Sequence, residues 1–180
     1  MKLYVRRIWN VQDIIFIYNG IIKGIEEKVF TEHNYMDLMR DVVNKDITFY
    51  IFYTDSKVVE IQGRSVGFGA INNDREVYHV FVVPSMRGKG VGIRISLWLK
   101  KTIMKKKERI PISFVKKTNK WKEVVEKQGM RETKHYRYTV FRMRLEDLKQ
   151  YVECLEKYKI DEIQFVPKVK PKATLGMWER

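Results

Sequence analysis

The chain has 180 residues, 44% of them hydrophobic, and its 36 Lys and Arg against 22 Asp and Glu give a formal charge of +14. We expect one globular domain with a sizeable core, and not a disordered chain, two full enzymatic domains or a membrane protein, because no apolar run approaches the roughly 20 residues that a bilayer requires. The start of the chain has no apolar segment followed by a small-residue cleavage site, so a cytoplasmic location is predicted.

The cysteine and histidine content predicts neither a disulfide nor a metal site. Cys154 is the single cysteine, and His33, His79 and His135 are scattered without ligand spacing. We interpret Cys154 as a packed or surface thiol on a helix, because nothing near it in sequence would clearly lower its pKa.

The first half of the chain predicts one strand, two helices and then a series of strands. Apolar spacing favours a helix over 11–30 after a strand at 3–8, and a second helix over 35–43 that begins after Asn34. Runs rich in β-branched and aromatic residues, separated by turn residues, predict the strands 47–53, 58–61, 66–71 and 76–83.

The second half of the chain predicts helices that alternate with strands. Ile95, Leu99 and Ile103 predict one apolar face of a helix within 93–104. A strand at 110–115, a helix over 120–128 that ends at Gly129, and an aromatic, basic strand at 136–145 follow. Residues 146–180 are predicted to form a C-terminal helix and a basic tail in which Pro167 and Pro171 exclude a helix.

The most informative segment is the glycine-rich turn between the strand at 76–83 and the following helix. Gly88, Gly90 and Gly92 allow backbone amides to approach an anion at the positive end of that helix. The spacing fits neither a Walker loop, because no hydroxyl residue follows Lys89, nor a dinucleotide fingerprint, because position 93 is Ile.

The same segment fills every position of the pattern Val-x-Pro-x-x-Arg-Gly-x-Gly-x-Gly, with Val82, Pro84, Arg87, Gly88, Gly90 and Gly92. It thereby resembles the acyl-coenzyme A motif of the Gcn5-related N-acetyltransferases (GNAT). The order of predicted elements over residues 1–145 is similar to that family too. The resemblance implies an α+β fold with a mixed, mostly antiparallel central sheet, flanked by helices and with its fourth and fifth strands splayed.

The resemblance also implies acetyl-CoA as the cosubstrate. Val82 and Val83 would bind the pantetheine amides, and Asn119 would reach the cofactor from the other side. The diphosphate would lie on Arg87 and on the amides of Gly88, Lys89, Gly90, Val91 and Gly92.

A second motif, Asn119 through Glu126-Lys127-x-Gly129-Met130, resembles a family pattern less completely. Val125 stands before Glu126, where the family usually carries the tyrosine that acts as general acid. Tyr138 or Tyr136 on the last strand is the candidate replacement.

For the general base, uninterrupted alternation along the strand at 76–83 places Glu76, Tyr78 and Val80 on the face of Val82. Glu76 is the first candidate and Tyr78 the second. Alternation turns His79 to the opposite face unless a bulge changes the parity.

Three functions follow from these features. The first is acetyl transfer from acetyl-CoA to an amine. The basic balance, which gives +7 within residues 116–144, suits an acceptor associated with nucleic acid. The second is modification of nucleic-acid bases by an enzyme similar to the Mom-type phage proteins. The third is a non-catalytic GNAT-like module that binds nucleic acid or protein.

Overall fold

The computed structural model describes residues 1–30, 40, 47–54, 65–74, 76–107, 110–115, 121–133 and 139–168. The predicted strand at 58–61 and, apart from Arg40, the predicted helix at 35–43 lie outside these residues. Asn119, Tyr136 and Tyr138 also lie outside them. In the part of the chain that is described, no helix has the length and apolar character needed to cross a bilayer.

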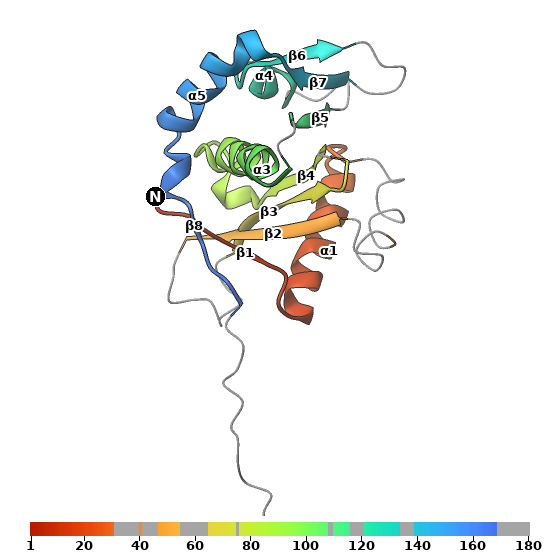
Figure 1. Ribbon diagram of the computed structural model, residues 1–180. Helices are drawn as coiled ribbons and strands as arrows, with labels where there is room; N and C mark the ends of the chain where they lie inside the picture. Colours follow the sequence, from red (N-terminus) through yellow and green to blue (C-terminus); the bar gives the residue numbers. More distant parts are fainter. Residues whose placement is uncertain are drawn as a thin grey trace, which may run out of the picture.

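One mixed sheet forms the centre of the molecule, and among the described residues it has eight strands in the order β6-β7-β5-β4-β3-β2-β1-β8 (Figure 1). The strands are β1 (Tyr4–Arg7), β2 (Ile47–Tyr53), β3 (Ser65–Asn72), β4 (Glu76–Val82), β5 (Ile112–Val115), β6 (Met130–Thr133), β7 (Thr139–Met143) and β8 (Gln164–Phe165). Neighbouring strands are antiparallel except for β4 with β5 and β1 with β8. The predicted α+β class, with a mostly antiparallel sheet, is confirmed.

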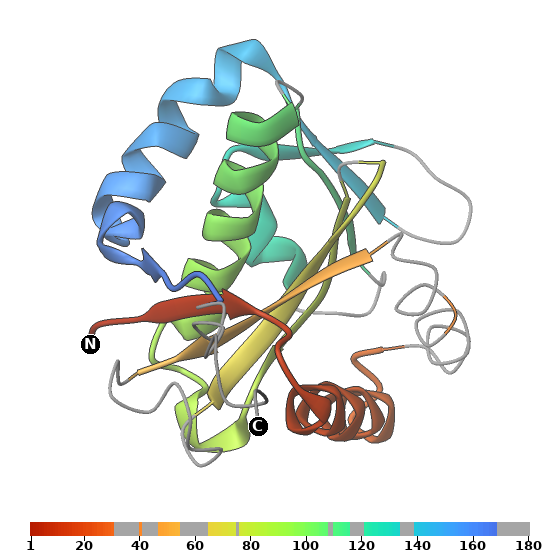
Figure 2. The same ribbon diagram turned by 60° about the horizontal axis from the view of Figure 1, so that its bottom comes forward.

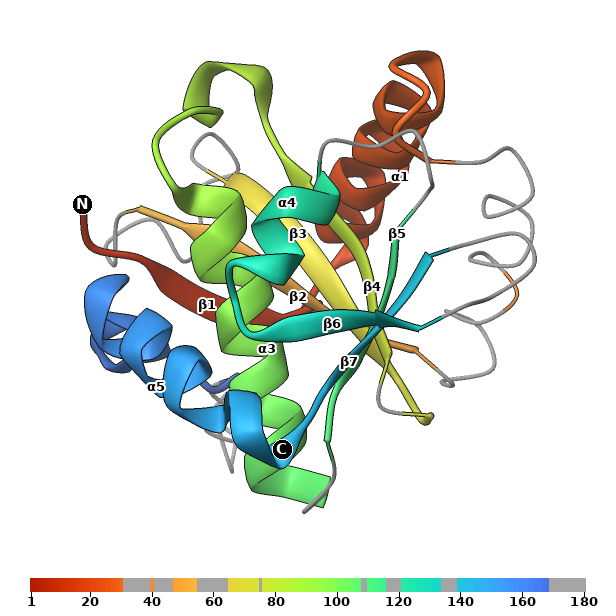
Figure 3. The same cartoon turned by 90° about the horizontal axis from the view of Figure 1, so that it is seen from above.

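Helices cover both faces of this sheet. Helix α1 (Val11–Glu26) lies on one face, and α3 (Val91–Lys107), α4 (Trp121–Glu126) and α5 (Leu148–Lys157) lie on the other (Figure 3). Asn10 starts α1 with a capping box, in which its side chain accepts a hydrogen bond from the Asp13 N–H at 3.0 Å. The buried Asp13 carboxylate also pairs with Arg6 of β1, which joins the start of α1 to the sheet.

The core has two parts, one on each face of the sheet. On the α1 face, Ile17 and Ile21 pack with buried side chains of β2, β3 and β4, including Phe49, Phe68 and Phe81. On the α3 face, a larger cluster contains the apolar stripe of α3, and its members from that helix are Val91, Ile95, Leu97, Leu99 and Ile103.

Strands β4 and β5 separate at the centre of the sheet. Among the described residues they pair where Glu76 faces Ile112 and Val77 faces Ser113, and no described residue of β5 pairs with Tyr78–Val82. This arrangement is the predicted splay, and it leaves one edge of β4 open.

A β-bulge interrupts β4 at His79. The pairing of β4 with β3 shifts between Phe68 and Ala70, and His79 has a positive φ of 49°. Val77 therefore belongs to the same core cluster as Val80 and Val82, although strict alternation would separate Val77 from Val80. The predicted parity of this strand is wrong on the N-terminal side of the bulge, so it no longer supports the choice of Glu76 and Tyr78.

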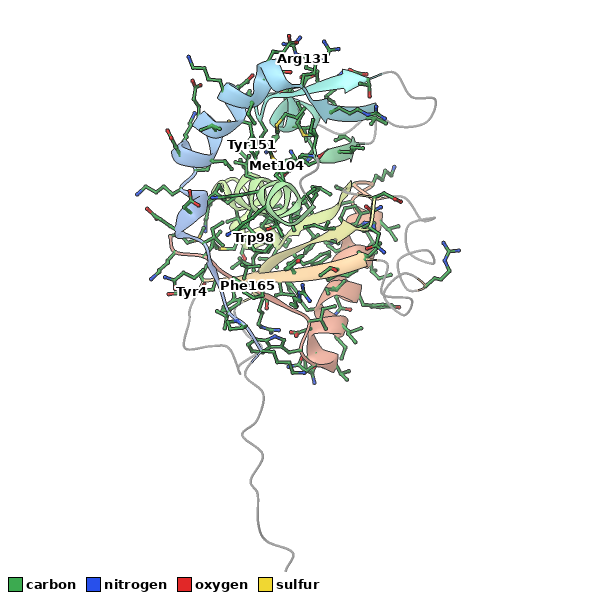
Figure 4. The ribbon with its side chains drawn as sticks, viewed as in Figure 1. Tyr4, Trp98, Met104, Arg131, Tyr151 and Phe165 are labelled. Carbon is green, nitrogen blue, oxygen red and sulfur yellow. The ribbon has the colours of Figure 1, made fainter. Side chains whose placement is uncertain are left out.

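The C-terminal segment is built into the same core. Tyr151 of α5 and Ile160 and Ile163 beyond it join the cluster on the α3 face. Figure 4 shows Tyr151 between α5 and α3, near Met104. The chain then returns along β1, where β8 adds a parallel strand (Figure 2). Strands β6 and β8 were not predicted from the sequence.

Candidate active site

The glycine-rich loop leads from the open edge of β4 directly into α3. A single 3-10 turn, Pro84–Met86, follows β4 and is closed by the Met86 N–H donating to the Val83 carbonyl at 2.9 Å. Gly88 and Gly90 then take φ values of 75° and 76°, a region that costs other residues about 1 kcal/mol or more. No atom lies within 4 Å of a Cβ built on either glycine, so the loop surface there is open.

The amides of this loop are available to an anion. Among the described residues, no backbone carbonyl accepts from the N–H groups of residues 88–93, and the first backbone bond of α3 runs from the Arg94 N–H to the Gly90 carbonyl at 3.1 Å. These donors stand at the positive end of a 17-residue helix. The loop therefore offers what a diphosphate requires.

A cavity of about 480 Å³ opens beside the loop. Its walls come from the loop, from β4 and β5, from the first turns of α3 and α4, and from the end of α1. The lining residues outside the loop include Glu27, Val29, Phe30, Val77, His79, Val80, Val82, Ser96, Ser113, Val115, Trp121 and Val124. An elongated thioester with a polar diphosphate and an apolar arm fits this combination of an anion loop and apolar walls.

The open edge of β4 provides backbone groups from Val82 and not from Val83. The Val83 N–H donates to the Val66 carbonyl of β3 at 3.0 Å, and the Val83 carbonyl accepts from Met86. Because backbone groups of successive residues face alternate edges of a strand, the N–H and carbonyl of Val82 face the gap toward β5, where the carbonyl already accepts a hydrogen bond from Arg87 Nε. The prediction that Val83 binds pantetheine is therefore withdrawn, and the prediction for Val82 stays.

Arg87 is held by the protein itself. Its Nε donates to the Val82 carbonyl at 2.9 Å, and its Nη2 lies 2.8 Å from Oε2 of Glu27, just past the end of α1. It lines the cavity, but its charge faces a carboxylate. The predicted role of Arg87 on the diphosphate stays a prediction.

His79, at the bulge, lies in the wall of the cavity. Its side chain is 8% exposed, and its ring meets that of Phe30 edge-on, with centroids 5.2 Å apart. Burial lowers the pKa of His79 from 6.5 to about 4, so the imidazole is neutral at pH 7. The side chains of Glu76 and Tyr78 are outside the described part of the structure.

Helix α4 presents apolar side chains to the cavity. Trp121 and Val124 line it, whereas Val125, at the position of the expected acid, is fully buried in the core. Trp121 and Val124 cannot donate a proton to a thiolate. The general acid predicted at Tyr138 lies outside the described residues.

A polar cluster lies behind the cavity. The Ser96 hydroxyl, which lines the cavity, donates to Oε1 of Gln128 at 3.3 Å, and the fully buried Lys100 donates to the same oxygen. No described carboxylate pairs with Lys100, and burial lowers its pKa from 10.5 to about 7.

Cys154 donates to the Lys127 carbonyl at 3.1 Å, and burial raises the pKa of its thiol, which disfavours a nucleophilic role.

Several cavity residues were not identified from the sequence. Ser96 lies one helical turn after Gly92 and could have been placed on the same face of α3 from that spacing alone. Glu27, Phe30 and Ser113 come from elements distant in sequence, so no local pattern identifies them. Within the described residues, no group of His, Cys, Asp or Glu could hold a metal ion.

Solved structures with the same fold include several acetyltransferases. The chain superposes on PaiA N-acetyltransferase from Thermoplasma acidophilum in complex with coenzyme A at 16% identity, covering 80% of this chain and 99% of the other, with a TM-score of 0.55. Spermidine N-acetyltransferase from Vibrio cholerae in complex with CoA and spermine is 13% identical, with 78% of this chain and 93% of the other covered and a TM-score of 0.58. An N-acetyltransferase from Staphylococcus aureus is 14% identical, with 81% of this chain and 99% of the other covered and a TM-score of 0.58.

At these identities the structural similarity establishes the fold, and the sequence comparison establishes the family. A search of curated proteins gives no match. The family model described as an acetyltransferase (GNAT) domain matches residues 21–141, about two thirds of the chain. It confirms the predicted enzyme class and does not support the Mom-type alternative. The chain belongs to the GNAT family of acetyltransferases.

Proposed function

We propose that this protein transfers the acetyl group of acetyl-CoA to an amine acceptor. The observation that supports this most directly is the open glycine loop, whose amides at the start of α3 stand at the mouth of a cavity bounded by the unpaired edge of β4. Acetyl-CoA, the usual cosubstrate of the family, supplies an activated acyl group on a thioester. The amides of residues 88–92 hold its diphosphate, and Val82 binds its pantetheine arm.

The transfer needs a neutral amine within the splay. The amine nitrogen attacks the acyl carbon, the C–N bond forms, the C–S bond breaks, and the amine proton is lost while the thiolate gains one. We propose Glu76 as the base, with Tyr78 as the second candidate and Tyr138 as the acid. Glu76 is supported by its place on β4 in the short pairing with β5, directly before the two strands diverge.

His79 is a weaker candidate for the base, although it lies in the cavity wall. A base whose pKa is about 4 removes few protons from an amine at pH 7. Its neutral imidazole instead forms part of the cavity wall beside Phe30.

Two variants of the loop test the coenzyme site. Gly90→Glu places a carboxylate in open space among the amides, and Gly90→Gln is the matched control with the same backbone strain and no charge. By isothermal titration, Gly90→Glu is expected to bind acetyl-CoA about a hundredfold more weakly than Gly90→Gln. Equal affinities for the two variants, or no binding by folded wild-type protein, would refute the proposed site.

Release of the CoA thiol in the presence of a panel of amines tests transfer. We expect Glu76→Gln to lower kcat and to leave the Kd of acetyl-CoA unchanged, and full turnover by this variant would remove Glu76 as the base. Coenzyme binding without transfer to any amine would favour the non-catalytic alternative. An acceptor associated with nucleic acid rests on net charge alone, and amine-bearing oligonucleotides in the same panel test it.

A further inference from the structure

A second concave site lies on the opposite side of α3 from the coenzyme cavity. It has a volume of about 600 Å³, and the N-terminal segment, α3, the end of α5 and the segment through β8 enclose it. Figure 1 shows the N-terminus beside the chain that leaves α5. At 3.6 residues per turn, Arg94 points about 160° away from both Gly92 and Ser96, which line the coenzyme cavity. The two cavities share no lining residue.

Arg94 lies at the floor of this second pocket. The side chain is 8% exposed, its Nη1 donates to the Met1 carbonyl at 2.7 Å, and its buried Nε has no acceptor among the described residues. A buried guanidinium that keeps an unused donor is costly unless a ligand or a counter-charge is available. Among the described residues that line the pocket, Glu162 alone is acidic.

Three lysines surround Arg94, and two of them are positioned by aromatic rings. Lys2 Nζ lies 5.5 Å from the Tyr4 ring centroid, and Lys157 Nζ lies 5.7 Å from that of Tyr158. Lys159 pairs with Glu162 at 3.3 Å. In the described part of the chain neither Lys2 nor Lys157 has a carboxylate partner. Among the described residues, four cationic side chains and one carboxylate line the pocket, so these side chains carry a net charge of +3.

We propose that this pocket binds a small phosphate-bearing anion independently of the coenzyme. A guanidinium recognises two phosphate oxygens through its fork of donors, and ammonium groups around it neutralise the remaining charge. Because Arg94 lies at the floor, a terminal phosphate or diphosphate can approach it more closely than a backbone phosphate of a duplex, which is flanked by sugars. The site therefore suits a small ligand better than DNA.

Titration of inorganic phosphate and pyrophosphate into the full chain saturated with CoA tests the proposal, because CoA blocks the glycine loop. We expect pyrophosphate to bind, and Lys2→Gln/Lys157→Gln to weaken it about tenfold. The matched control is Lys105→Gln/Lys149→Gln, which removes the same number of charges from two exposed lysines outside the pocket; it is expected to keep wild-type affinity.

Arg94→Lys adds a second test that keeps the charge and removes the fork, and it is expected to weaken pyrophosphate binding while CoA affinity is unchanged. Equal weakening by Lys105→Gln/Lys149→Gln would show that only the overall charge of the chain matters, and it would overturn the proposal. Loss of pyrophosphate binding when CoA is present, or binding of duplex DNA with no binding of pyrophosphate, would also overturn it.

Discussion

Arg87 of the glycine-rich loop forms an ion pair with Glu27, the residue that follows α1, and its Nη2 lies 2.8 Å from Oε2 of Glu27. Its Nε also donates to the Val82 carbonyl, so one side chain joins the loop, the open edge of β4 and the end of α1. A carboxylate thus stands close to the proposed diphosphate site. Its charge opposes the ligand, and it also occupies the guanidinium that the family resemblance assigns to that ligand.

Removing this carboxylate is expected to strengthen coenzyme binding. Glu27→Gln frees the charge of Arg87 and removes a negative charge near the loop, so we predict an affinity for acetyl-CoA about threefold higher at low salt. Glu26→Gln is the control, because Glu26 pairs with Lys23 on the exposed side of α1. An unchanged or weaker affinity of Glu27→Gln in isothermal titration would show that Arg87 serves only to hold the loop.

The buried Lys100 is expected to destabilise the fold at neutral and acidic pH. Its folded pKa of about 7 lies below the unfolded value of 10.5, so the unfolded chain binds more protons between these values and stability rises with pH across that window. Lys100→Met is therefore predicted to raise the free energy of unfolding by about 2 kcal/mol at pH 6 and by less at pH 9.

Urea denaturation at the two pH values measures this difference. Lys101→Met is the neighbouring control, since Lys101 is partly exposed and pairs with Asp161 at the surface. A Lys100→Met protein that is less stable than wild type at pH 6 would mean that the bond to Gln128 outweighs the burial of the amine.

His79 is expected to make the protein sensitive to acid. Its folded pKa of about 4 lies below the unfolded 6.5, so the unfolded chain binds more protons in this window and stability falls as the pH drops from 6.5 to 4. His79→Asn keeps a residue that tolerates the positive φ of the bulge. Between pH 7 and pH 4.5, wild type should lose about 2 kcal/mol more than this variant in urea denaturation. Parallel losses would contradict the burial of the imidazole.

The sequence predicts the shape of the glycine-rich loop because its determinants are local. A proline, three glycines and the start of a helix lie within nine residues, and backbone geometry alone exposes the amides of the proposed anion site. The sequence also predicts the long strands and the helices α1, α3 and α5, because their apolar residues repeat with the period of a strand or a helix over most of each element.

The remaining features depend on contacts between distant segments. The bulge at His79 is a property of the register between β3 and β4, and a period-two pattern contains no information on it. The pairing of Arg87 with Glu27 spans 60 residues. Strand β8 has only two residues, and it forms because the segment that follows α5 packs beside β1.

The C-terminal helix is expected to unfold together with the rest of the chain. Tyr151 is buried against α3, and its hydroxyl has no partner among the described residues. Tyr151→Ala should lower the free energy of unfolding by about 3–5 kcal/mol in one cooperative transition, whereas Tyr151→Phe, which removes the unpaired hydroxyl, should be neutral or raise it by about 1 kcal/mol. Val152→Ala, on the exposed side of α5, is the control. A separate early transition in Tyr151→Ala would indicate that residues beyond 145 fold as an independent appendage. A helix that packs in the common core with β1 and α3 should instead unfold together with them.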